Sequence, residues 1–195
     1  MESKEYLKYK WFFTSSGKLV IGGKNAEQND ELLSRLKKQK EDYIVMHTSS
    51  PGSPFSIILS PLKSIKDSDT EECAIFTGCF SRAWRSQKKT ETVDIFKLSQ
   101  LAKEKSMKTG TWGVAGKVAH KKVELKLVLT RQKGILRAVP EITVKDKKEV
   151  LLKLSPGTLD KKDLLPKLEL EFDETFTQDE VLSALPAGGL SILQK

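Results

Sequence analysis

The chain has 195 residues, of which 38% are hydrophobic and 31% are charged, so it is long enough to bury a sizeable core. No apolar run approaches the ~20 residues of a membrane-spanning helix, and the charged N-terminal segment lacks the apolar stretch of a secretory signal. These features argue against a membrane protein, and we expect a cytoplasmic one with no membrane partner.

The formal net charge of +8 is spread unevenly along the chain. Residues 117–153 hold 11 Lys and Arg against 4 Asp and Glu, whereas residues 154–195 hold 4 against 8. A basic segment of this kind suits a polyanionic partner, most simply nucleic acid. A lysine-rich surface kept for solubility explains the charge equally well, so the charge alone does not decide.

The N-terminal segment WFFTSSGKLVIGG predicts two short strands, at residues 11–14 and 18–21, around a Ser-Ser-Gly turn. A helix should follow these strands. Asn25 is a favoured N-cap residue, and Gln28 lies three residues later, at the spacing of a capping box.

The double glycine before this helix suggests a phosphate-binding loop. A Walker A loop requires a lysine and then Ser or Thr directly after its last glycine. Here Gly23 occupies the lysine position and Asn25 follows Lys24, so nucleotide hydrolysis through this loop is not expected. The segment therefore predicts a strand–turn–helix junction, whose helix N-terminus beside Lys24 can hold a phosphate oxygen.

The middle of the chain predicts strands at residues 42–47, 55–60 and 91–98, with a central helix over residues 68–89. Two alternative capping boxes open this helix, Ser68 with Glu71 or Asp69 with Glu72. Its two cysteines have no neighbouring ligand residues, so we expect buried structural thiols. The expected buried face of the helix comprises Cys73, Phe76, Cys79 or Phe80, and Ala83.

The C-terminal part alternates between strand-like and helical patterns. Strands are predicted at 111–119, 122–130, 135–139 and 149–157, with RQKG as a hairpin turn, and helices at 160–168 and 177–189. We expect the acidic segment to pack as ordinary fold. The predicted fold is α+β: a mixed, mostly antiparallel sheet packed with a central helix and shorter flanking helices.

Catalytic patterns are weak in this sequence. Its two histidines, His47 and His120, have no cysteine or carboxylate next to them at metal-ligand spacing, and there is no G-x-S-x-G motif. The carboxylates cluster at helix starts and in the tail, where capping and solvation explain them. We therefore predict no catalytic residue, no metal ligand and no cofactor.

Two basic segments favour nucleic-acid binding. In SRAWRSQKK an arginine can hold a phosphate with two hydrogen bonds, and an exposed Trp84 can stack on a base for roughly 1–3 kcal/mol, although a core tryptophan is the simpler interpretation. In GKVAHKK the lysines can follow a phosphate backbone without reading its sequence. The basic and polar candidates in these two segments are Arg82, Arg85, Lys88, Lys117, His120, Lys121 and Lys122.

Residues 11–33 resemble the opening of the NFACT-R domain, the RNA-binding domain of ribosome quality-control proteins of the RqcH/NEMF type. Three further segments are similar to that family in the same order, DYIVMH at 42–47, SRAWRS at 81–86 and KTGTWGVAGK at 108–117. The SPG and LPAGG motifs of the tail resemble an extension found beside the domain in archaeal members. The resemblance extends over roughly residues 9–120 and is looser beyond them.

The resemblance implies RNA contact near Lys24, Asn25, Gln28, Asn29, His47, Arg82, Trp84, Arg85 and Lys117. Members of the family bind tRNA and the large ribosomal subunit. Ser49 and Pro51 stand where the family commonly has an acidic residue and a second histidine, which weakens any acid–base centre there. Since the other regions of the full-length proteins are missing from the chain, a stand-alone form of the domain is expected.

The sequence thus predicts a non-catalytic RNA-binding protein that contacts tRNA or ribosomal RNA, with the large ribosomal subunit as a further partner. Residues 1–140 are expected to form the NFACT-R-like domain, and residues 141–195 a C-terminal α/β extension packed on it. The alternatives are a metal-dependent nuclease and a protein-interaction module that uses the acidic tail. The complete set of predicted RNA-binding residues is Lys18, Lys24, Asn25, Gln28, Asn29, His47, Arg82, Trp84, Arg85, Lys88, Lys117, His120, Lys121 and Lys122.

Overall fold

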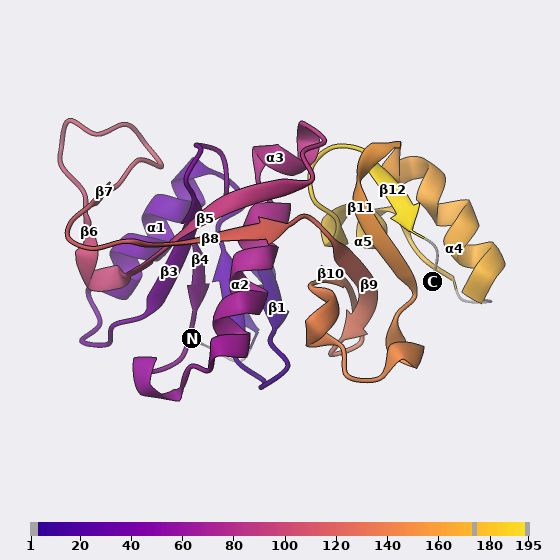
Figure 1. Ribbon diagram of the computed structural model, residues 1–195, viewed down its shortest axis with the longest axis horizontal. Coiled ribbons are helices and arrows are strands. Elements are labelled where there is room, and N and C mark those ends of the chain that lie inside the picture. Colours follow the sequence, from indigo (N-terminus) through magenta and orange to yellow (C-terminus); the bar gives the residue numbers. More distant parts are fainter. Residues whose placement is uncertain (1–3, 173–174, 194–195) are drawn as a thin grey trace.

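Two antiparallel sheets organise the chain into two lobes that lie side by side (Figure 1). The computed structural model describes residues 4–172 and 175–193. The first lobe holds a six-stranded sheet in the order β1-β2-β4-β3-β5-β8, and all its strand pairs are antiparallel. Its strands are β1 Lys10–Phe13, β2 Leu19–Gly22, β3 Ile44–Thr48, β4 Ser56–Ile58, β5 Thr90–Lys97 and β8 Ala119–Glu124.

One helix covers each face of this sheet. Alternate strand residues point to opposite faces, so Phe12 and Met46 pack toward helix α2, Asp67–Cys79, whereas Val45 and Phe96 share a separate core with helix α1, Ala26–Lys37. The small residue Gly78 of α2 allows a close approach to the sheet. A Cβ on Gly78 would lie 2.9 Å from Val123 Cγ2 of β8.

The second lobe is a four-stranded antiparallel sheet in the order β10-β9-β11-β12, flanked by two helices. The lobes share one core, because buried residues of both belong to the same hydrophobic cluster. As expected, the acidic segment packs as ordinary fold, with Leu154 and Leu164 fully buried. The elements are β9 Leu127–Gln132, β10 Ile135–Val139, β11 Leu152–Leu159, α4 Leu164–Phe172, α5 Gln178–Ala184 and β12 Leu190–Leu193.

Shorter elements connect these lobes and sheets. Helix α3, Arg82–Arg85, follows α2, and β6, Leu101–Ala102, pairs with β7, Gly113–Val114. The 3-10 helices are η1 Glu5–Lys8, η2 Leu62–Ser64, η3 Leu98–Gln100, η4 Glu141–Thr143, η5 Lys147–Glu149 and η6 Lys161–Asp163. Within the described residues, no helix is long and apolar enough to span a membrane.

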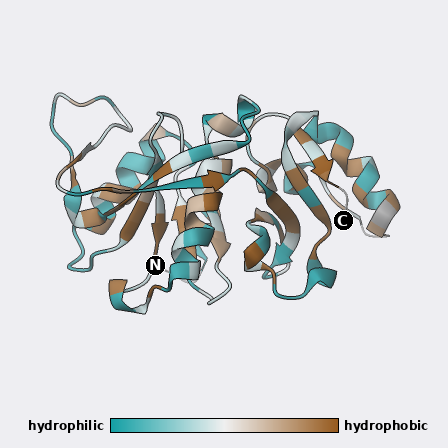
Figure 2. Cartoon of the chain, viewed as in Figure 1, coloured by the Kyte–Doolittle hydropathy of each residue, from teal (hydrophilic) through white to brown (hydrophobic). Residues whose placement is uncertain are grey.

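The α+β fold class is confirmed, while two predicted strands were wrong. The segment 122–130 is divided between β8 and β9 in different sheets, because the Lys126 amide donates to Glu124 O at 3.2 Å, which makes a tight turn between the two strands. Gly116, at φ 80°, likewise separates β7 from β8 within the predicted strand 111–119. Figure 2 shows the resulting contrast between a largely hydrophilic β8 and a hydrophobic β9.

The six-stranded sheet ends along the chain with β8 at Glu124, and the four-stranded sheet begins with β9 at Leu127. Strands β9 and β10 therefore share a sheet with β11 and β12, which follow residue 140. The domain boundary at residue 140 stays a prediction. The RQKG hairpin turn between β9 and β10 is confirmed, with Lys133 and Gly134 both at positive φ.

The central helix is shorter than the predicted 68–89. It ends at Cys79, because the Ser81 hydroxyl donates to Gly78 O at 2.7 Å, accepts from the Ala83 amide at 3.1 Å and so begins a new helix, α3. Both predicted capping boxes were also wrong. The helix begins earlier, at Asp67, and Asp69 accepts from the Lys66 amide at 2.9 Å.

The two acidic residues Asp69 and Glu72 are fully buried and hold the β1–β2 turn, while Asp69 also accepts from the N-cap amide. The Thr14 and Ser16 hydroxyls each donate to Asp69 at 2.6 Å, and the Ser15 amide donates to Glu72 at 2.7 Å. Thr143 also donates to Glu72, so this cluster fastens the second lobe to α2.

The thiols of α2 are buried and free, as expected, and burial raises the pKa of both.

The double glycine is required by close packing on both sides of the β2–α1 junction. A Cβ on Gly22 would lie 2.9 Å from Pro54 Cβ, and a Cβ on Gly23 would lie 2.4 Å from Asn29 Oδ1 and 2.7 Å from Asn29 N. The predicted cap is confirmed: Asn25 Oδ1 accepts from the Gln28 amide at 2.8 Å. This junction is therefore a tight turn into a capped helix.

We expect Gly23→Ala to destabilise the protein by about 1–3 kcal/mol, since the added methyl group must displace the start of α1. Urea unfolding followed by circular dichroism measures this change. Gly113→Ala is the matched control, because its methyl group would meet the flexible end of Met107 at 3.2 Å. Equal losses in the two variants would contradict the packing argument.

Candidate nucleic-acid interface

A cleft of about 720 Å³ lies at one end of the six-stranded sheet. Strands β2 and β3 end there, β1 and β4 begin there, α1 starts there and α2 gives way to α3. The loop 48–54 and the segment 109–114 complete the walls. Figure 1 shows α3 above this end of the sheet.

Basic side chains dominate the charge of this cleft. Lys10, Lys24, Arg82 and Arg85 line it, and Asp94 is the one carboxylate among the lining residues that the structure describes. The charge of the cleft therefore suits a polyanion. Its location beside the N-terminus of α1 adds the positive end of a 12-residue helix.

The side-chain stems of the two arginines of α3 pack against glycines of other loops. The Arg82 amide donates to Gly52 O at 2.9 Å, and a Cβ on Gly52 would lie 2.4 Å from Arg82 Cδ. Arg85 lies against Gly188 of the second lobe, where a Cβ would be 2.7 Å from Arg85 Cα. Both arginines are exposed, and neither guanidinium forms an ion pair within the described part of the chain.

The predicted amide residues of α1 shape the turn. Asn29 is 7% exposed, and its Oδ1 accepts from the Phe55 amide at 3.3 Å. Gln28 Oε1 accepts from the Lys24 amide at 2.9 Å. Asn25 and Asn29 line the cleft, whereas Gln28 does not. The hydrogen bonds of these three side chains hold the turn that carries Lys24. Their direct contact with RNA stays a prediction.

The two histidines lie on β3 and β8, the strands on either side of Asp94 in β5, so they have a carboxylate nearby in space that their spacing in the sequence does not reveal. His47 and His120 both pair with Asp94 in the strand register, and His120 Nδ1 lies 2.7 Å from Asp94 Oδ1. The Ser49 hydroxyl also donates to Asp94. His47 lines the cleft and its Nδ1 lies 2.7 Å from Thr48 O, while burial lowers the pKa of its imidazole.

Trp84 does not form a stacking platform, and its assignment to RNA contact is corrected. The side chain is 1% exposed within the core that the two lobes share. Its indole Nε1 donates to Gly189 O at 3.0 Å, which connects α3 to the LPAGG segment of the second lobe. Its location in the core agrees with the simpler interpretation of this tryptophan.

The remaining predicted lysines lie outside the cleft. Lys18 sits in the β1–β2 turn, at the opposite end of these strands, where its amide donates to Thr14 Oγ1. Lys88 pairs with Glu91 at 3.2 Å, and Lys121 lies 3.6 Å from Glu71. Two further candidates, Lys117 and Lys122, are exposed. The structure therefore brings together Lys24, Asn25, Asn29, His47, Arg82 and Arg85, while His120 meets this group only through Asp94.

Lys10 is the residue that sequence reasoning missed. It begins β1, lines the cleft and places its Nζ 4.9 Å from the ring centre of Phe80. Burial, with a smaller effect of the nearby Lys161 and Lys24, lowers the pKa of its ammonium to about 8. A lysine between Tyr9 and Trp11 at the start of an apolar strand was the available signal.

These features place the protein in the class of α+β domains with a basic cleft. No three His, Cys, Asp or Glu side chains of residues 4–172 and 175–193 gather as a metal-binding group. Comparison with known proteins gives the particular family. Residues 8–116 match the family of the NFACT protein RNA binding domain.

Two relatives agree with this match. The chain is 31% identical to the archaeal Rqc2 homolog aRqcH of Methanocaldococcus jannaschii over all of its own length, which is 30% of that protein. It is 32% identical to the ribosome quality control complex subunit NEMF homolog of Drosophila melanogaster over 40% of the chain and 8% of that protein. The chain thus spans less than a third of either relative.

A solved structure supports the fold. The C-terminal part of the fibronectin/fibrinogen-binding protein from Streptococcus suis is similar with a TM-score of 0.50 and 24% identity, over 60% of this chain and 44% of that one. The chain belongs to the NFACT protein RNA binding domain family.

Proposed function

We propose that this protein is a non-catalytic, cytoplasmic RNA-binding protein of ribosome quality control, which holds tRNA or ribosomal RNA in the cleft beside α3. The large ribosomal subunit is the proposed platform. The observation that carries the proposal is the pair Arg82 and Arg85, whose stems pack against glycines and whose guanidinium groups form no ion pair with any residue of the ranges 4–172 and 175–193. The family match and the names of the relatives point to the same function.

The chemistry of the cleft suits phosphate contacts more than base reading. Arginine binds phosphate with two parallel hydrogen bonds, and such charge-assisted bonds are about twice as strong as neutral ones. Three of the four Phe and Trp side chains that line the cleft are largely buried, with Phe55 5% exposed, Phe96 4% and Trp112 9%. The fourth, Phe80, is half-buried beside Lys10. The protein should therefore recognise the shape and backbone of a folded RNA.

The affinity for RNA is expected to fall steeply with salt. Three or four phosphates neutralised by the basic lining residues give a log–log slope of about −3 to −4, which is about a hundredfold between about 50 and 200 mM monovalent salt. Fluorescence anisotropy with a labelled tRNA transcript measures the slope. An affinity indifferent to salt would contradict phosphate binding in the cleft.

An RNA-processing enzyme is the second candidate, and the Asp94–His120 pair is the observation that favours it. Histidine beside a carboxylate can move a proton in phosphodiester cleavage. Labelled tRNA incubated with the protein and Mg²⁺ or Mn²⁺ should stay intact on a denaturing gel. Site-specific cuts that disappear in His120→Ala would replace our proposal with this one.

A further inference from the structure

Lys10 is a half-buried cation at the start of β1. Among the described residues no carboxylate pairs with its ammonium, and its neighbours are the ring of Phe80 and the ammonium groups of Lys24 and Lys161. Removing a charge from water is unfavourable, and neighbouring charges of the same sign add to that cost. The pKa of the Lys10 ammonium, lowered to about 8, reflects the same two causes, with burial the larger.

The three lysines come from different parts of the fold. Lys10 begins β1, Lys24 lies between β2 and α1, and Lys161 opens η6 in the second lobe. Lys161 is itself partly buried, which lowers its pKa, while the adjacent Asp160 acts in the opposite direction. The cluster therefore lies where the two lobes meet.

Other contacts bring the second lobe to the same place. Ala187 lines the cleft, Gly188 lies against Arg85, and Gly189 O accepts from the Trp84 indole. These residues belong to the LPAGG segment, so the second lobe forms part of the wall beside the arginines. A ligand in the cleft therefore lies within reach of both lobes.

We propose that Lys10, Lys24 and Lys161 form one phosphate-binding site at the junction of the lobes, and that it holds a phosphate group of the bound RNA. This inference rests on the proposed function and extends it, because it makes the second lobe part of the RNA site. An anion placed among three ammonium groups removes their mutual repulsion and supplies the missing counter-charge. The phosphate is a diester of the backbone or a terminal monoester.

Binding at this site should depend on pH. Lys10 is protonated below about pH 8 and attracts phosphate, and it loses this charge as the pH rises through its pKa. The charges that face it, those of Lys24 and Lys161, are both positive, so no acidic group of the part of the chain that the structure describes offsets the loss. RNA affinity should therefore fall by about tenfold between about pH 7 and 9, the effect of one lost phosphate contact.

Without RNA the dependence has the opposite sign. The pKa of Lys10 is lower in the folded protein than in the unfolded chain, so the unfolded chain binds more protons between about pH 8 and 10 and stability rises with pH there. A free energy of unfolding that rises with pH, together with an RNA affinity that falls with pH, would indicate a buried lysine whose positive charge the RNA phosphate offsets. Denaturant unfolding across this pH range supplies that second measurement.

The test compares wild type with Lys10→Met, Lys161→Met and the control Lys162→Met, using anisotropy with the tRNA transcript across this pH range. Lys10→Met should bind about tenfold more weakly at pH 7 and lose the fall in affinity centred at about pH 8, because the ammonium with that pKa is gone. Lys161→Met should weaken binding and move the midpoint to higher pH, since one repelling charge is gone. Lys162 is exposed on the same 3-10 helix, and its variant should match wild type.

The outcomes separate this inference from the proposed function. A pH dependence that persists in Lys10→Met, or a midpoint that Lys161→Met leaves unchanged, would overturn the junction site while RNA binding stands. Absence of RNA binding at every pH would overturn the proposed function itself. Transcripts with a 5′-phosphate and a 5′-hydroxyl distinguish the sources: a difference that disappears in Lys10→Met indicates a terminal monoester, and equal binding indicates the backbone.

Discussion

Replacing Arg82 and Arg85 together with glutamine is expected to weaken RNA binding by about a hundredfold at low salt. Each arginine offers charge-assisted hydrogen bonds to phosphate worth about 1.5–3 kcal/mol, and their exposure favours the lower limit. Two such losses amount to about 3 kcal/mol, which is roughly a hundredfold in dissociation constant. The salt dependence should also become shallower, by about one unit of slope for each lost phosphate contact.

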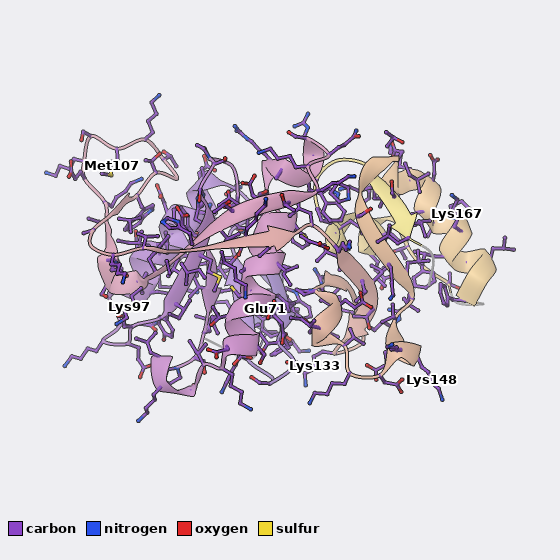
Figure 3. The ribbon with its side chains drawn as sticks, viewed as in Figure 1. Glu71, Lys97, Met107, Lys133, Lys148 and Lys167 are labelled. Atoms are coloured by element: carbon purple, nitrogen blue, oxygen red, sulfur yellow. The ribbon has the colours of Figure 1, made fainter. Side chains whose placement is uncertain are left out.

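Lysine substitutions at the same two positions separate the effect of the charge from the effect of the paired hydrogen bonds. Lysine at both positions keeps the charges but loses the paired hydrogen bonds, so its affinity should lie between those of wild type and the glutamine variant. Lys147→Gln with Lys148→Gln removes the same charge from η5, which lies at the far end of the second lobe from α3 (Figure 3). If this control lost as much affinity as the arginine variant, binding would depend on net charge and not on the cleft.

The sequence predicted the elements whose signals are local. Asn25 was identified as a helix cap because its partner amide lies three residues away, and the RQKG turn because its residues are those that a tight hairpin favours. The division between β8 and β9 was missed for a related reason. Alternating apolar residues continue through Leu125 and Leu127, and alternation does not reveal that the two strands belong to different sheets.

The candidate site was predicted only in part, because its composition depends on contacts distant in sequence. Arg82 and Arg85 were found from their charge, but the glycines that hold them, Gly52 and Gly188, lie in other loops. Lys10 was missed because its importance comes from burial beside Phe80 and from a lysine of the second lobe. A short sequence window contains none of these neighbours.

Trp84→Ala is expected to destabilise the protein by about 3–5 kcal/mol, the cost of removing a large buried aromatic side chain. The indole fills the core between the lobes and donates to a carbonyl 105 residues away in sequence, so this loss should loosen the second lobe from α3. Trp84→Phe keeps most of the buried ring but leaves Gly189 O without its donor, at a cost of about 1–3 kcal/mol. Denaturant unfolding measures both changes.

RNA binding by a third variant distinguishes the structural role of Trp84 from a stacking role. Trp84→Leu fills part of the space without an aromatic ring, so under conditions in which it is folded its RNA affinity should equal that of wild type. If Trp84 stacked on a base, the same variant would lose about 1–3 kcal/mol of binding free energy. Because the indole is 1% exposed, we expect Trp84→Leu to lower the stability of the protein and to leave its RNA affinity unchanged. This result would assign the tryptophan to the contact between the lobes and RNA binding to its charged neighbours on α3.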